Sequence, residues 1–163
     1  MLNSSAVILP PLPFRRPWKW FPKGMRFSGE SFDLPEGIKK AKIIVIDDEP
    51  IIAETVAEIL KDEGFEAVFV SNGDSAIELA RAETPDIVLS DVIMPGINGI
   101  ETAIRIREIA PSCRIILFSG QAATVDQLET AHAQGHDFQI IAKPIKPELL
   151  LAVIREAMSS GRD

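Results

Sequence analysis

The 163-residue sequence is 46% hydrophobic, which is enough for a folded core and excludes a chain that is disordered throughout. Residues 1–42 hold eight Lys/Arg and three Asp/Glu (+5), whereas residues 43–163 hold nine and 21 (−12). Because so acidic a body repels phosphate backbones, we expect that the domain itself does not bind nucleic acid. The single cysteine excludes an internal disulfide, and no apolar run has the roughly 18–20 residues that span a bilayer, so we expect a cytoplasmic protein without a transmembrane segment.

Residues 1–41 form a basic segment that is rich in proline and aromatic residues and has no helical or strand periodicity. The stretch from Phe14 to Lys23 combines cations with aromatic rings, a pattern that could contact an anionic lipid or nucleic-acid surface. Its prolines break the amphipathic helix that membrane binding usually needs, so we favour a disordered leader, or upstream sequence that precedes a true start at Met25.

From Ile43 onward, short apolar runs typical of buried strands alternate with helical patterns. The predicted strands are Ile43–Ile46, Ala67–Val70, Ile87–Leu89, Arg114–Phe118 and Ile140–Ala142. The helical patterns that follow them are Pro50 to Gly64, Ala76–Ala80 after an Asn72-Gly73 turn, Ile100–Ile104, Thr124–Gln134 and Leu149–Ala157. Five βα units predict an α/β fold over residues 42–160, with a doubly wound five-stranded parallel sheet and helices on both faces.

Polar residues follow the ends of four of these strands: Asp47 and Asp48, then Asp91, then Ser119, then Lys143. Because parallel sheets gather the carboxyl ends of their strands at one edge, we expect these side chains to share one pocket. Three carboxylates this close repel one another unless a cation intervenes, and Mg²⁺ prefers oxygen ligands. With the metal and Lys143 the charges cancel, so Asp91 could attack phosphorus as a nucleophile and form an aspartyl phosphate.

The motifs occur in a fixed order: Asp47-Asp48 after an apolar strand, Asp91 before Val-Ile-Met-Pro-Gly, then Ser119, then Lys143-Pro144. This combination resembles the receiver domain of two-component response regulators, over about residues 42–158. The resemblance implies a flavodoxin-like sheet of strand order 2-1-3-4-5. It also implies Mg²⁺-dependent phosphorylation of Asp91 by a histidine kinase, which switches binding to a partner.

The resemblance further implies a role for each residue of the pocket. Asp48, Asp91 and the carbonyl group of Ile93 would bind the metal directly, while Asp47 would act partly through water. Lys143 would pair with the phosphoryl group, and its bond to Pro144 is often cis in the family. Ser119 would move toward the phosphoryl group as the switch hydroxyl.

One position departs from the family pattern. The family usually has an aromatic residue three positions before the lysine, where this chain has Ile140, and the nearest aromatic is Phe138. We therefore expect the phosphorylation chemistry of the family but altered switching through Ser119 and Ile140. The simplest role of the Ile140–Ala142 strand is in the core.

A receiver of this kind catalyses only its own phosphorylation and dephosphorylation and is not otherwise an enzyme. The partners implied are a sensor histidine kinase or phosphotransfer protein and a downstream protein target, with a homodimer through the last helices as an option. No second domain follows the receiver in this sequence, so we expect the stand-alone type, with no DNA-binding domain. Two alternatives remain open: a degenerate receiver that acts as a phosphorylation-independent adaptor, and an aspartyl-phosphate phosphohydrolase, although Asp47-Asp48-Glu49 lacks the Asp-x-Asp spacing of that class.

Overall fold

The computed structural model describes residues 40–120 and 125–159. The chain divides into two units, Met1–Ile38 and Lys39–Asp163, and every described residue belongs to the second. The predicted leader therefore lies, except for its last two residues, outside the described part of the chain, as does Thr124 at the start of the fourth predicted helix. Within the described ranges no helix is both long and apolar enough to cross a membrane.

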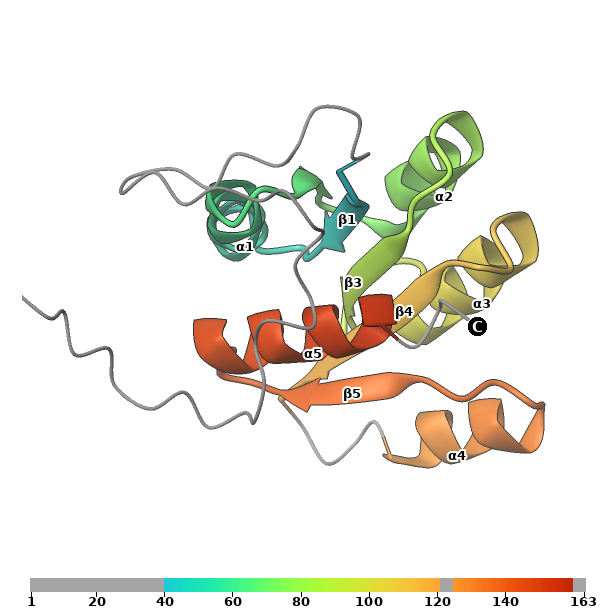
Figure 1. The fold of residues 1–163 in the computed structure, drawn as a ribbon. Coiled ribbons are helices and arrows are strands. Elements are labelled where there is room, and N and C mark those ends of the chain that lie inside the picture. The colour runs from blue at the N-terminus through green and yellow to red at the C-terminus, as the bar shows by residue number, and fades with distance from the viewer. Residues whose placement is uncertain (1–39, 121–124, 160–163) are drawn as a thin grey trace, which may run out of the picture. The chain divides into compact units, whose positions relative to one another are not determined.

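Strands and helices alternate along the described chain, and the strands form one parallel sheet of order 2-1-3-4-5 (Figure 1). This arrangement confirms the predicted doubly wound α/β fold. The strands are β1 (Lys42–Ile46), β2 (Glu66–Val70), β3 (Ile87–Asp91), β4 (Arg114–Ser119) and β5 (Gln139–Ala142). The helices are α1 (Pro50–Asp62), α2 (Gly73–Ala82), α3 (Gly99–Ile109), α4 (Val125–Ala133) and α5 (Pro147–Ser159).

Burial differs between the centre and the edges of the sheet. All five residues of β3 are buried, and so are the last four of β1, because each of these strands has a neighbour on both sides and helices over both faces. The edge strands β2 and β5 are covered less completely, and Val68 and Ile140 are 44% and 45% exposed. The best-shielded strands, β1 and β3, are therefore the two that lead into the aspartates.

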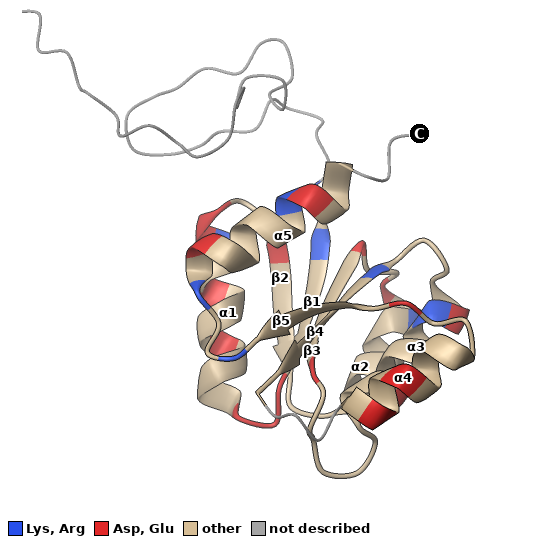
Figure 2. Ribbon diagram, turned by 90° about the horizontal axis from the view of Figure 1, so that it is seen from below, with Lys and Arg blue, Asp and Glu red and all other residues tan. Residues whose placement is uncertain are grey.

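Two apolar layers enclose the sheet. Helices α1 and α5 pack against one face, where they meet Ile43 and Val45 of β1. Helices α2, α3 and α4 pack against the other face, where they meet Ile44 and Ile46. Figure 2 shows the sheet between these two sets of helices. Because successive side chains of β1 enter opposite layers, the strand is apolar from Ile43 to Ile46 instead of alternating with polar residues.

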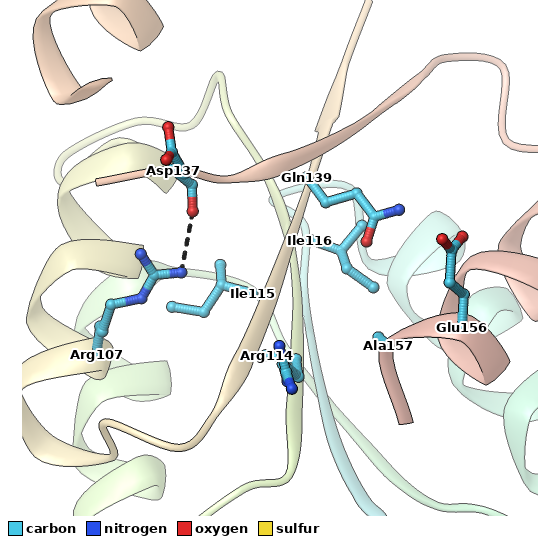
Figure 3. A pocket seen from close by; sticks show the side chains of 8 residues that line it. All are labelled: Arg107, Arg114, Ile115, Ile116, Asp137, Gln139, Glu156 and Ala157. Atoms are coloured by element: carbon cyan, nitrogen blue, oxygen red, sulfur yellow. Dashed lines mark hydrogen bonds between the residues drawn. The ribbon is translucent and has the colours of Figure 1, made fainter. Parts of the chain in front are cut away.

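A cavity of about 200 Å³ lies at the amino-terminal ends of β4 and β5 (Figure 3). It is lined by Arg107, Arg114, Ile115, Ile116, Asp137, Gln139, Glu156 and Ala157. Arg107 is held beside it, since its guanidinium group donates a hydrogen bond to the carbonyl oxygen of Asp137 and lies 4.7 Å from the ring centre of Phe138. The predicted aspartates, Ser119 and Lys143 do not line this cavity, because they lie at or just after the opposite, carboxyl-terminal ends of the strands.

Candidate functional site: a carboxylate pocket at the carboxyl edge of the sheet

Asp91 is the last residue of β3 and is only 7% exposed. Its carboxylate accepts hydrogen bonds from two directions: Oδ1 from the backbone N–H of Ile93 at 3.3 Å, and Oδ2 from Lys143 Nζ at 2.9 Å. Directly after Asp91 the chain leaves the sheet through a turn that contains Gly96 at a φ of 78°, a conformation that suits glycine. The strand end and the turn together fix this carboxylate at the edge of the sheet.

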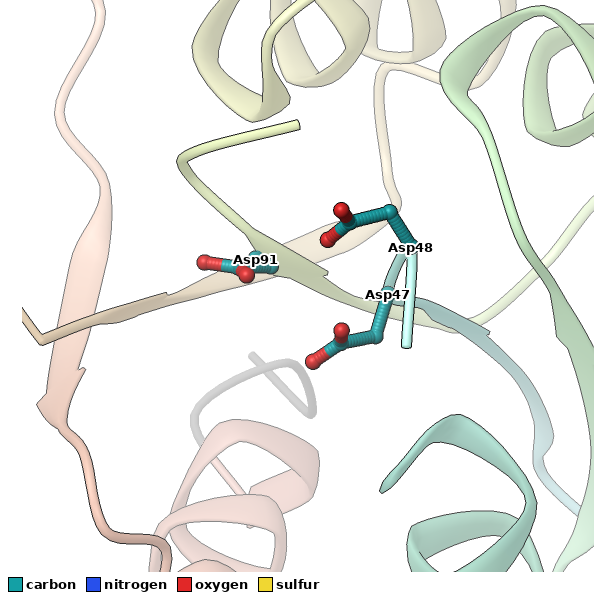
Figure 4. Close-up of side chains that lie close together, drawn as sticks. All are labelled: Asp47, Asp48 and Asp91. Atoms are coloured by element: carbon teal, nitrogen blue, oxygen red, sulfur yellow. The ribbon is translucent and has the colours of Figure 1, made fainter. Parts of the chain in front are cut away.

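Asp47 and Asp48 lie beside Asp91 because β1 and β3 are paired neighbours in the sheet. Asp47 is 1% exposed; its Oδ1 accepts a hydrogen bond from Glu49 N at 2.9 Å and its Oδ2 accepts one from Lys143 Nζ at 3.1 Å. Asp48 is exposed to solvent. Figure 4 shows the three side chains close together where β1 and β3 end. The pocket therefore has a closed side at Asp47 and an open side at Asp48.

Lys143 follows β5 and connects the two buried carboxylates. Its backbone N–H donates to the carbonyl oxygen of Ser119 at 3.0 Å, which ties it to the end of β4, and its peptide bond to Pro144 is cis. Burial lowers the pKa of its ammonium group, but hydrogen bonds and charges from Asp91 and Asp47 outweigh burial and raise the pKa above the ordinary 10.5. Lys143 therefore remains a cation at neutral pH.

The donor set of the pocket suits a hard divalent cation. One oxygen each from Asp47, Asp48 and Asp91 lies within 4.8 Å of the other two, and all three are carboxylate oxygens, the kind of ligand that Mg²⁺ takes. Two oxygens bound to the same Mg²⁺ are separated by roughly 3–4 Å, given bond lengths of about 2.0–2.1 Å. The carboxylates are thus close to the separation that coordination needs, and the exposed side at Asp48 leaves room for water ligands.

The remaining predicted site residues lie at different distances from this centre. Ile93 is two residues beyond Asp91, and its backbone N–H contacts the Asp91 carboxylate. Ser119 ends β4, is partly buried, and is linked through its carbonyl oxygen to Lys143 N. Ile140 pairs with Leu117 of β4 and is 45% exposed, so the expectation that it belongs to the core is wrong. The reason is that β5 is a short edge strand, of which only Ile141 is buried.

The order of the strands predicts that Lys143 lies in the pocket, but not that one ammonium group contacts two carboxylates at once. A second feature that the sequence analysis missed is the backbone N–H of Glu49, which donates to Asp47. The Asp-x-Glu spacing gives a weak signal for it, because an aspartate often accepts a hydrogen bond from the N–H two residues later. Both contacts reduce the cost of burying negative charge.

Comparisons with known proteins agree with this geometry. The family described as the response regulator receiver domain matches residues 43–155. The DNA-binding response regulator MtrA of Mycolicibacterium smegmatis is 31% identical over 124 residues, which cover 76% of this chain and 53% of that protein. The nitrate/nitrite response regulator protein NarL of Escherichia coli is 37% identical over 119 residues, which cover 72% and 54%. A CheY-like receiver domain protein from Methanospirillum hungatei has a TM-score of 0.70, covers 76% of this chain and 97% of its own, and at 24% identity supports the fold alone.

These relatives correct one prediction. From the sequence we expected no DNA-binding domain and a stand-alone receiver, but MtrA is a DNA-binding response regulator, and this chain spans about half the length of the curated relatives that it matches. That expectation rested on the lack of a second domain after the receiver, and the acidic charge of residues 43–163 bears only on that body itself. Repulsion between that body and a phosphate backbone says nothing about a domain elsewhere in a longer polypeptide.

Proposed function

Because this chain belongs to the response regulator receiver domain family, we propose that its carboxylate pocket accepts a phosphoryl group on Asp91. Phosphorylation is a general property of this family, whose members act in two-component signal transduction, and its receiver domains bind Mg²⁺ at an acidic pocket. The observation that carries the assignment to Asp91 is its position: a buried carboxylate at a strand end, 2.9 Å from an ammonium group that also contacts Asp47.

The transfer is a displacement at phosphorus. A carboxylate oxygen of Asp91 forms the new P–O bond while the bond from phosphorus to the nitrogen of a phosphohistidine breaks, and the imidazole that leaves takes up a proton. When bound, Mg²⁺ would supply positive charge against the oxygens of the phosphoryl group. We assign that ion to Asp48, Asp91 and the carbonyl group of Ile93, with Asp47 acting partly through water.

The other residues of the pocket stabilise the charge that the phosphoryl group brings. Lys143 Nζ lies 2.9 Å from Asp91 Oδ2, so it stays within reach of oxygens attached to phosphorus at that position. Ser119, at the end of the neighbouring strand, supplies a hydroxyl group that can donate to one of them. Catalysis by this chain is then limited to its own phosphorylation and dephosphorylation, and the result is a change in its affinity for a partner.

The test is an intact-mass measurement on the full chain, incubated with Mg²⁺ and a small phosphodonor such as acetyl phosphate. The wild type is expected to gain one phosphoryl group, and Asp91→Asn is expected to gain none. Asp86→Asn is a matched control, because Asp86 stands just before the same strand and an asparagine there keeps an oxygen to accept the hydrogen bond from Lys42 N. A wild type without an adduct would favour an adaptor that needs no phosphate, and continued hydrolysis of a phosphate ester would favour a phosphohydrolase.

A further inference from the structure

Two helices in the described chain begin in the same way. Helix α2 starts at Gly73 after Asn72, and helix α3 starts at Gly99 after Asn98. In both, the Asn side-chain oxygen accepts a hydrogen bond from the backbone N–H three residues later, at 2.8 Å. The two starts therefore have the same cap and the same first residue, and they differ in what the glycine contacts.

Gly99 contacts the backbone of the proposed phosphoacceptor. A Cβ atom at residue 99 would overlap the carbonyl oxygen of Asp91, and it would lie 2.8 Å from the carbonyl carbon of Asp91 and 2.9 Å from the Cα atom of Val92. Real Cβ atoms essentially never come this close, and the atoms in the way belong to the backbone. Gly99 N also donates to Val92 O at 2.9 Å. The start of α3 thus lies directly against the end of β3.

The peptide between Asp91 and Val92 cannot move away easily, because it is held from other directions too. Asp91 O accepts a hydrogen bond from the buried hydroxyl group of Ser90 at 3.0 Å, and Val92 N donates to Phe118 O at 3.0 Å. Any displacement at this peptide would pass to the two groups beside it, the Asp91 carboxylate and the N–H of Ile93 that contacts it.

Gly73 has a different neighbour. A Cβ atom there would overlap the side-chain oxygen of Thr102 and lie 3.4 Å from Ile97. Thr102 is completely buried on α3 and its hydroxyl group donates to Asn98 O at 2.8 Å. A methyl group at Gly73 would therefore disturb the packing between α2 and α3, but it has no atom of Asp91 or Val92 among its nearest neighbours.

We propose that Gly99 is a positioning residue for phosphoryl transfer. Because Gly99 has no side chain, the start of α3 can pack against the end of β3 and hold the Asp91–Ile93 backbone in the position that the reaction needs. This inference rests on the proposed function of Asp91. Its physical basis is that displacement of a reacting group by about 1 Å can slow a reaction by about 100-fold, even when the substituted residue is outside the reacting atoms.

The experiment compares Gly99→Ala with Gly73→Ala in the full chain, with acetyl phosphate as phosphodonor. Both variants are expected to unfold at lower urea concentration. Only Gly99→Ala is expected to slow adduct formation, by about 100-fold at saturating Mg²⁺, and to shift the amide resonance of Ile93 strongly. A purely structural role would lower stability in both variants and leave the rates equal, and that outcome would overturn the proposal.

A second pair of variants covers the case in which Gly99→Ala fails to fold. Asn98→Ala and Asn72→Ala each remove one cap without adding an atom toward β3. The proposal expects Asn98→Ala to phosphorylate more slowly than Asn72→Ala when both are folded, because only the first loosens the helix start that seats Asp91. Equal rates would contradict it. A wild type that forms no adduct would instead refute the proposed function, so the two failures can be told apart.

Discussion

Two lysines of this protein each lie between two carboxylates, at opposite ends of the sheet. At the amino end, Lys42 Nζ is 3.1 Å from Glu83 and 3.9 Å from Glu66, whose side chains are 55% and 52% exposed. At the carboxyl edge, Lys143 Nζ is 3.1 Å from Asp47 and 2.9 Å from Asp91, whose side chains are 2% and 10% exposed. The geometry of the ion pairs is similar, but the surroundings of the acids are not.

This difference in exposure changes what the ion pairs do. The hydrogen bond and charge of Glu83 raise the pKa of Lys42, yet water screens the whole cluster, and exposed pairs of this kind contribute little to stability. The acids around Lys143 are buried, so the removal of its ammonium group would leave two carboxylates facing each other with little solvent. A buried arrangement of this kind is costly to maintain and is typical of functional sites.

The largest expected effect comes from exchanging each lysine for methionine, which has a similar length but no charge. Lys143→Met should slow phosphorylation of Asp91 by about 100-fold, the usual cost of losing one charge-stabilising donor. Lys42→Met should leave the rate unchanged, because its partners are at the other end of the sheet. Initial rates of adduct formation, read by intact mass, check this. Equal rates in the two variants would remove the functional distinction between the two lysines.

The next effect concerns the metal. Mg²⁺ should stabilise the wild type against urea, since a ligand that binds only the folded state adds about 2.7 kcal/mol at 100 times its Kd. Asp48→Asn should weaken Mg²⁺ binding by at least the roughly 10–100-fold that changes in the outer shell of a metal site cost. Asp62→Asn, the same change at the exposed end of α1, is the control. A Kd for Mg²⁺ that is the same in both variants, measured by titration calorimetry, would contradict the assignment.

The smallest expected effect concerns a buried thiol group at the amino end of the sheet, where no phosphorylation chemistry is expected. Cys113 stands just before β4, and burial, followed by the charge of Asp86, raises its pKa from 9.0 to about 12. Above pH 9 the unfolded chain loses the thiol proton that the folded protein still holds. The contribution of the thiol to the free energy of unfolding is therefore complete below pH 9 and declines as the pH rises toward 12.

The expected loss for the wild type is roughly 1 kcal/mol between pH 9 and pH 10, in urea unfolding followed by circular dichroism. Cys113→Ala should lack this loss in the free energy of unfolding. The phosphorylation rate per folded molecule should be the same in the wild type and in the variant. A wild type and a variant with parallel stability curves from pH 8 to pH 11 would show that the thiol does not titrate in this way.

The sequence predicts the sheet and the contents of its pocket because both depend on local signals. Apolar runs such as Ile43–Ile46 mark the buried strands, and a parallel sheet brings their carboxyl ends together, so residues that follow several strands can be grouped before any coordinates exist. The predicted fold and the family were confirmed on this basis. The roles assigned to the site residues all stay predictions, for Asp47, Asp48, Asp91, Ile93, Ser119, Ile140 and Lys143.

Other features depend on contacts between distant segments, which no local pattern contains. Asn72-Gly73 was predicted to be a turn, but Asn72 caps α2 and Gly73 is the first residue of that helix, because the same residue pair suits either structure. The close approach of Gly99 to Asp91 depends on how α3 packs against β3. The exposure of Ile140 depends on how little of β5 the neighbouring helices cover.

The central claim is that Asp91 itself carries the phosphoryl group, and trapping the adduct tests it most directly. Borohydride reduces an acyl phosphate to an alcohol, so an aspartyl phosphate becomes homoserine, which a fragment mass spectrum can place in the sequence. We predict homoserine at position 91 in the wild type after treatment with Mg²⁺ and acetyl phosphate, and at no other aspartate. Homoserine at position 47 or 48, or a phosphorylated protein whose residue 91 is still aspartate after reduction, would contradict the account.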